Sequence, residues 1–111
     1  MDKLNDGEII KSIYINDEIT KYFISNHGNV YRELKTGCKK LKPEVNHGYL
    51  RVGLHHNGKT CHKRIHRLVG KYFIDNPYGY DIIHHIDNDK TNNHYTNLKW
   101  VTSKENSQYA K

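Results

Sequence analysis

Long hydrophobic runs are absent from this sequence. Hydrophobic residues make up 35% of the 111 residues, the mean hydropathy is −0.94, and no stretch approaches the roughly 18 apolar residues that a membrane-spanning helix needs. The opening segment MDKLNDGEIIK also lacks the apolar core of a signal peptide. We therefore expect no membrane partner and an intracellular protein that is not secreted.

Cysteine is scarce as well. Cys38 and Cys61 lie far apart in the sequence and lack the paired spacing of structural zinc sites. Two reduced thiols are expected, with a single disulfide, or a zinc site that also uses His62 and His66, as alternatives. The short chain excludes a large multidomain enzyme and holds one small domain or two modules that share a core.

Acidic residues are outnumbered by basic ones. The sequence has 18 Lys and Arg against 12 Asp and Glu, a net charge of +6 and a pI near 9.3. Eleven basic and two acidic residues lie between Arg32 and Lys71, a local balance of +9. This concentration predicts a polyanionic partner, first of all double-stranded DNA, with a solvated basic face as the alternative.

Two hairpins are predicted in the first half of the chain. Residues 22–25 and 30–32 are extended segments joined by the turn sequence Asn-His-Gly-Asn, and residues 49–55 alternate before the Asn57-Gly58 turn and a return strand over 59–65. The outer face of the second hairpin is expected to carry Arg51, Lys63 and Arg64. The residues expected to contact DNA are Arg51, Lys59, Lys63, Arg64 and Arg67, with pairing to a nearby carboxylate as the alternative for Arg67.

From His66 onward the pattern changes to that of an α+β unit. Apolar residues recur at helical spacing from His66 until Asn76-Pro77, which predicts a short amphipathic helix. A strand ending at residue 85, a polar loop over 87–97 and a second strand or tight turn over 98–101 follow. Thr102 and Glu105 fit a capping box for a last helix over about 103–109.

Polar side chains in this last unit have the types that phosphodiester hydrolysis requires. A base that titrates near neutral pH, ligands for a divalent ion and a group that orients the base are the necessary parts. His84 and His85 end the first strand, Asn97 precedes the second, and Asn106 falls in the last helix. The spacing Asp87-Asn88-Asp89 resembles the start of a calcium loop, but the required Gly and Glu are missing, so a turn is expected.

The segments HRLVGKYFIDNP and IIHHIDNDKTNNHYTNLKWVTSKEN resemble the HNH endonuclease domain of homing-type enzymes in residue order and spacing. The upstream segments EII and YFISNHGNV are similar to a small nuclease-associated modular domain that contacts DNA. The resemblance implies an α+β fold of small antiparallel hairpins followed by a ββα-metal unit. It divides the chain into a flexible N-terminus (1–7), a β-rich DNA-binding module (8–64) and an HNH domain (65–111).

The resemblance also implies roles for the polar residues. The catalytic residues are His85, as the general base, and Asn97, which braces the loop and orients His85. His84 and Asn106 bind one divalent ion in a one-metal mechanism that leaves a 5′ phosphate. Mg²⁺ is expected, with Mn²⁺ or another transition metal as the alternative because imidazole suits those ions better.

The predicted function is a metal-dependent DNA endonuclease, of homing or mobile-element type and encoded by a phage or virus. It uses no small-molecule cofactor and acts as a monomer or weak dimer. The alternative is a catalytically degenerate DNA-binding protein that keeps the basic sheet and lacks a working metal site.

Overall fold

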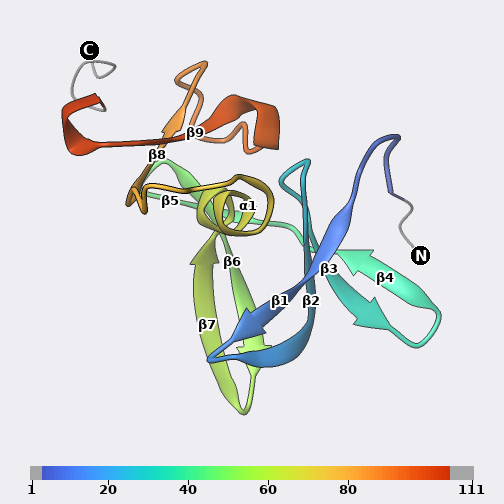
Figure 1. The fold of residues 1–111 in the computed structure, drawn as a ribbon. Coiled ribbons are helices and arrows are strands. Elements are labelled where there is room, and N and C mark those ends of the chain that lie inside the picture. The colour runs from blue at the N-terminus through green and yellow to red at the C-terminus, as the bar shows by residue number, and fades with distance from the viewer. Residues whose placement is uncertain (1–3, 106–111) are drawn as a thin grey trace.

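The fold of the computed structural model, which describes residues 4–105, is built from three antiparallel sheets and one α-helix (Figure 1). The elements are β1 (Ile10–Ile15), β2 (Glu18–Ser25), β3 (Val30–Leu34), β4 (Gly37–Lys40), β5 (Glu44–Asn46), β6 (Tyr49–His56), β7 (Lys59–Arg64), α1 (Ile65–Phe73), β8 (Ile82–His85), η1 (Tyr95–Asn97, a 3₁₀ turn) and β9 (Leu98–Val101).

The sheets have the strand orders β1-β2-β3-β4, β5-β6-β7 and β8-β9, which confirms the α+β class. None of the helices described in this range has the length and apolar character to cross a membrane.

Both predicted hairpins form. β2 pairs with β3 across the turn at 26–29, and β6 pairs with β7 across Asn57 and Gly58, whose positive φ values of 52° and 74° suit this tight turn. The strand pair β8-β9 is confirmed, as is the capping box, in which Thr102 Oγ1 accepts from the Glu105 amide at 3.1 Å. Residues 103–105 are helical, and the rest of the predicted last helix lies outside the described residues.

The prediction that Arg51, Lys63 and Arg64 share one face of the second hairpin is wrong for Lys63. Arg51 pairs with Arg64 across β6 and β7, whereas Lys63 pairs with Val52. Directly opposed residues project to the same side of a sheet, so Lys63 lies on the side of buried Val52, opposite the two arginines.

The central helix α1 ends three residues earlier than predicted. Ile74 is already extended, with φ −123° and ψ 119°. The side chain of Asn76 donates to the Tyr80 carbonyl at 2.7 Å and accepts from the Tyr80 amide at 2.9 Å. Asn76 thus closes a turn ahead of the next strand, and the backbone leaves the helix before reaching it.

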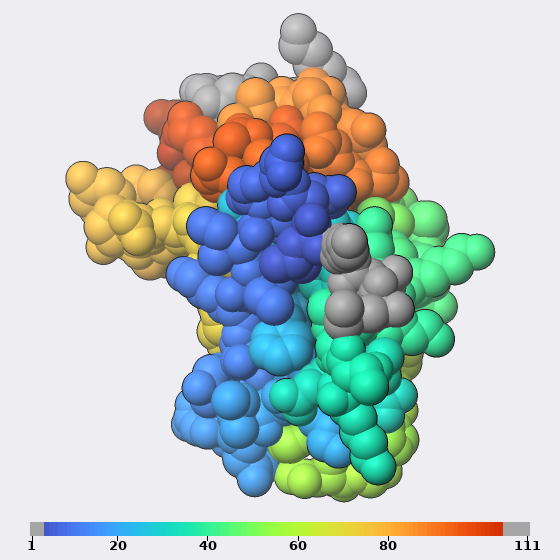
Figure 2. Space-filling model, turned by 90° about the vertical axis from the view of Figure 1, so that its right-hand side faces the viewer, coloured from blue at the N-terminus to red at the C-terminus, as the bar shows by residue number. Residues whose placement is uncertain are grey.

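One hydrophobic core joins all three sheets around α1. Ile65, Leu68 and Val69 on the buried face of α1 belong to the same cluster as Ile24 of β2 and Leu98 of β9. Figure 1 shows α1 between the β5-β7 sheet and the β8-β9 pair, and Figure 2 shows the N-terminal strands (blue) against the C-terminal unit (orange to red). The predicted boundary at 64/65 falls where β7 runs directly into α1, and the division into modules stays a prediction.

A buried carboxylate anchors the start of the first sheet. Glu8 is 7% exposed and accepts hydrogen bonds from the Asn5 amide at 2.9 Å, Asn29 Nδ2 at 2.8 Å and the Tyr31 hydroxyl at 3.0 Å. Burial acts to raise the pKa of Glu8, but hydrogen bonds, including one from Ser25, outweigh it and lower this pKa to about 2. Asn5, inside the segment predicted to be flexible, is therefore held by Glu8.

We predict that Glu8→Gln lowers the free energy of unfolding at neutral pH by on the order of 2 kcal/mol. The folded pKa of about 2 lies below the ordinary value of 4.5. The stabilisation is therefore complete above about pH 4.5 and is lost as the pH falls towards 2. Urea unfolding of both proteins across this range measures the difference, with Glu33→Gln, on exposed β3, as the control. An equal difference at neutral and acidic pH contradicts the prediction.

Candidate active site

His85, at the end of β8, is buried and held by a neighbouring amide. Its side chain is 5% exposed, and Nε2 lies 2.8 Å from Oδ1 of Asn93, which is 4% exposed. A carboxamide oxygen can only accept, so His85 Nε2 is the donor. In the neutral imidazole the proton is therefore on Nε2, and the lone pair of Nδ1 is available to accept another. Asn93 belongs to a loop rich in asparagine, and no sequence signal distinguishes it from its neighbours.

Asn97 closes the polar loop that begins after β8. Its Oδ1 accepts from the Asp87 amide at 3.1 Å, and its Nδ2 donates to Asp87 Oδ1 at 2.9 Å and to the Asn92 carbonyl at 2.9 Å. Hydrogen bonds, the largest contribution being from Asn92, lower the pKa of Asp87. The carboxylates of Asp87 and Asp89 are thus acceptors within a turn, as expected.

An aromatic cluster packs beside His85. The Tyr49 ring centroid lies 4.9 Å from that of His66 and 6.0 Å from that of His85, and the two histidine rings are 5.2 Å apart. Burial, with nearby positive charge, lowers the pKa of His66 to about 4, so this imidazole is neutral at neutral pH. Arg64 and Lys90 both lie over the Tyr49 ring, at 4.8 and 4.9 Å from its centroid.

His84 is half-buried on β8, opposite Lys99 of β9. Burial, followed by the neighbouring His85 and Lys99, lowers the pKa of His84. The other predicted metal ligand, Asn106, lies outside the described residues. Within residues 4–105, no three or more His, Cys, Asp or Glu side chains are grouped so as to hold a metal ion.

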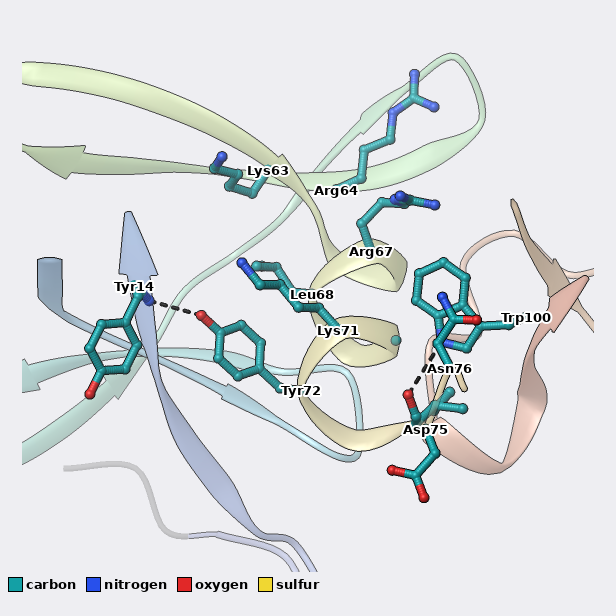
Figure 3. Close-up of a pocket in the computed structure, with 12 residues that line it drawn as sticks. Tyr14, Lys63, Arg64, Arg67, Leu68, Lys71, Tyr72, Asp75, Asn76 and Trp100 are labelled. Carbon is teal, nitrogen blue, oxygen red and sulfur yellow. Dashed lines mark hydrogen bonds between the residues drawn. The ribbon is translucent and has the colours of Figure 1, made fainter. Parts of the chain in front are cut away.

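A basic groove of about 530 Å³ runs along α1 (Figure 3). Lys63 and Arg64 from the end of β7 line it together with Arg67 and Lys71 of α1, with Trp100 among the other lining residues. Arg67 donates to the Asp81 carbonyl, and its guanidinium lies 5.2 Å from the centroid of a Trp100 ring. The structure thus brings three of the five predicted DNA contacts together and adds Lys71.

The other two predicted DNA contacts lie away from this groove. Arg51 Nε pairs with Glu44 Oε1 across β5 and β6. Lys59 begins β7 next to the tip of the β6-β7 hairpin. Both residues belong to the β5-β7 sheet, which also carries Lys63 and Arg64.

Residues 63–108 match the family model described as HNH endonuclease. Over 86 residues the chain is 43% identical to the uncharacterized HNH endonuclease L245 of Acanthamoeba polyphaga mimivirus, a match that covers 77% of this chain and 26% of that protein. Over 89 residues it is 43% identical to the DNA endonuclease I-HmuI of Bacillus phage SP01, covering 77% of this chain and 48% of that protein.

A solved structure matches as well. The HNH homing endonuclease I-HmuI, in a structure described as showing DNA binding and cleavage, superposes with a TM-score of 0.75 at 38% identity, over 91% of this chain and 56% of that chain. The chain thus spans about half the length of I-HmuI and about a quarter of the mimivirus protein. Residues 63–108 thus carry a domain of the HNH endonuclease family, and the chain is similar in sequence and in fold to HNH homing endonucleases.

Proposed function

We propose that this chain is a metal-dependent endonuclease that hydrolyses phosphodiester bonds in double-stranded DNA. The observation that carries the proposal is the buried histidine at the end of β8, with Nε2 of His85 held by Asn93. The similarity to I-HmuI, a DNA endonuclease, supports it. Relatives from a mimivirus and a phage support a virus- or phage-encoded nuclease of homing type that acts inside a host cell.

His85 is the general base in this proposal. Because Nε2 donates to Asn93, Nδ1 is the atom that takes a proton from the attacking water. Histidine suits this step because its ordinary pKa lies close to neutral pH. Asn97 acts as a positioning residue, since it closes the loop that carries Asn93 and pairs with the backbone on both sides.

His84 and Asn106 would hold one divalent ion. The ion's charge would offset the negative charge that develops on the phosphate. The donors fit this role because the lowered pKa of His84 keeps its imidazole neutral, and one imidazole with one amide leaves coordination positions for phosphate oxygens and water. Mg²⁺ is the expected ion, and Mn²⁺ or another transition metal suits the imidazole ligand better.

DNA contacts the basic groove along α1 and the adjoining β5-β7 sheet. Arg64 belongs to both the groove and the aromatic cluster, where it lies over Tyr49 beside His85. A phosphate backbone in the groove that contacts Arg64 would therefore lie close to His85. On the sheet, Arg51 extends the face that carries Arg64, and Lys59 extends the opposite face, which carries Lys63. The protein acts as a monomer or weak dimer.

We predict that His85→Ala slows cleavage of supercoiled plasmid by about 100-fold or more with Mg²⁺ or Mn²⁺, because the general base is lost. The matched control is His55→Ala, a histidine on the exposed face of β6, which is expected to cleave like the wild type. Chelation with EDTA is expected to stop cleavage by the wild type. DNA binding without cleavage in either metal contradicts the proposal and supports the degenerate DNA-binding protein.

We also predict that the double substitution Lys63→Ala, Lys71→Ala lowers DNA affinity and reduces the slope of log K against log salt by about 2, because two phosphate contacts are lost. Titrations of a labelled duplex at several salt concentrations measure this slope. Lys35→Ala, Lys39→Ala removes the same charge from the β3-β4 hairpin and serves as the control. Equal slopes for the two double variants show that the groove does not contact DNA.

A further inference from the structure

We infer that the turn at residues 26–28, in the N-terminal module, is a positioning element of the active site that acts on His85 through Asn93. This inference rests on the proposed function for the role of His85. The N-terminal module would thus complete the catalytic unit in addition to contacting DNA.

Residues 26–28 of the turn contact residues 93–95 of the polar loop one by one. Three successive turn residues meet three successive loop residues in antiparallel order. Gly28 lies against Asn93, the His27 ring stacks on that of His94 with centroids 4.7 Å apart, and the Asn26 carbonyl accepts from the Tyr95 amide at 2.8 Å.

The contact at Gly28 leaves no space for a side chain. A Cβ added there would lie 2.8 to 2.9 Å from the carbonyl oxygen, carbonyl carbon and Cβ of Asn93, atoms that are mostly backbone and cannot turn aside. Gly28 also has φ +83°, which favours glycine. The turn backbone therefore sets how far Asn93 can move away from His85.

The turn is itself rigidly held. Asn26 Oδ1 accepts from the Ile9 amide at 2.8 Å, and Asn26 Nδ2 donates to the Gly7 carbonyl at 3.2 Å. Ser25, which is fully buried, accepts from the amides of His27 and Asn29 through its hydroxyl. These bonds connect the turn to the N-terminal segment, so it can act as a fixed support.

The position of Asn93 decides which ring nitrogen of neutral His85 carries the proton. Asn93 holds the proton on Nε2 only while its Oδ1 stays within hydrogen-bond distance. Displacing the Asn93 backbone lengthens this bond, and neutral His85 then populates both tautomers. The Nδ1-protonated form cannot accept a proton from water at Nδ1, so the cleavage rate falls while DNA binding is retained.

The test compares two glycine variants with similar backbone strain. Gly28→Ala presses on Asn93, whereas Gly58→Ala, at φ +74°, meets nothing within 4 Å. The first measurement is the long-range ¹H–¹⁵N spectrum of His85 at alkaline pH, assigned with His85→Ala, which reports the tautomer. The second is single-turnover cleavage beside duplex affinity.

In the wild type and in Gly58→Ala we expect the Nε2-protonated tautomer. In Gly28→Ala we expect a mixture of tautomers and cleavage at least about tenfold slower, with DNA affinity within about twofold of the wild type. A Gly28→Ala protein with the wild-type spectrum and rate overturns the inference. If the wild type itself does not cleave DNA, the proposed function fails, and the tautomer comparison still decides the inference.

A second pair of variants applies if Gly28→Ala does not fold. His27→Ala removes the ring that stacks on His94, and His27→Phe keeps an aromatic ring there. We expect His27→Ala to slow cleavage about threefold and to raise the fraction of the Nδ1-protonated tautomer, and His27→Phe to restore both. Wild-type behaviour of His27→Ala in both measurements shows that the turn is a structural contact alone.

Discussion

The packing of one short helix supports the rest of the structure. α1 has nine residues, too few to be stable alone in water, so its stability comes from the apolar face that it buries. That face meets the first sheet, the β6-β7 hairpin and the β8-β9 pair in a single core. Gly70 brings the helix close to Ile83 of β8, since a Cβ there would lie 2.5 Å from Ile83 Cδ1. The β8-β9 pair, which carries His85, thus packs directly against α1 and shares one core with the preceding sheets.

The candidate active site is polar and adjoins this apolar core, since His85 pairs with Leu98 across β8 and β9. His85 and Asn93 are both buried, and each supplies a hydrogen-bond partner to the other. Asn97 closes the loop that carries Asn93, and Gly28 of the 26–28 turn packs against Asn93. Gly28 lies more than fifty positions before His85 and Asn93 in the chain, so the contacts around this imidazole join segments that are remote in sequence. Arg64 connects the basic groove to this site, because it lines the groove and also lies over Tyr49, whose ring is beside His85.

Sequence patterns predicted the elements that local chemistry specifies. Turn residues at 57 and 58, the capping box at Thr102 and Glu105, and the alternation in β6 all act between near neighbours, and the structure confirms each. β4 and β5 have no such pattern, because short polar segments become strands only by pairing with β3 and β6. The side to which Lys63 points depends on the β6-β7 register, because a shift of one residue in the pairing moves every side chain of the strand to the opposite face.

By itself the sequence determined the fold class, the spacing of His84, His85 and Asn97, and the basic character of the segment from Arg32 to Lys71, because these depend on residue type and order. Tertiary structure alone decided which asparagine holds His85, which cations share a groove, and that the turn at 26–28 reaches the loop that carries Asn93. The physical reason is that hydrogen bonds and packing contacts join atoms by distance in space, and distance between segments remote in sequence is set only when the common core forms.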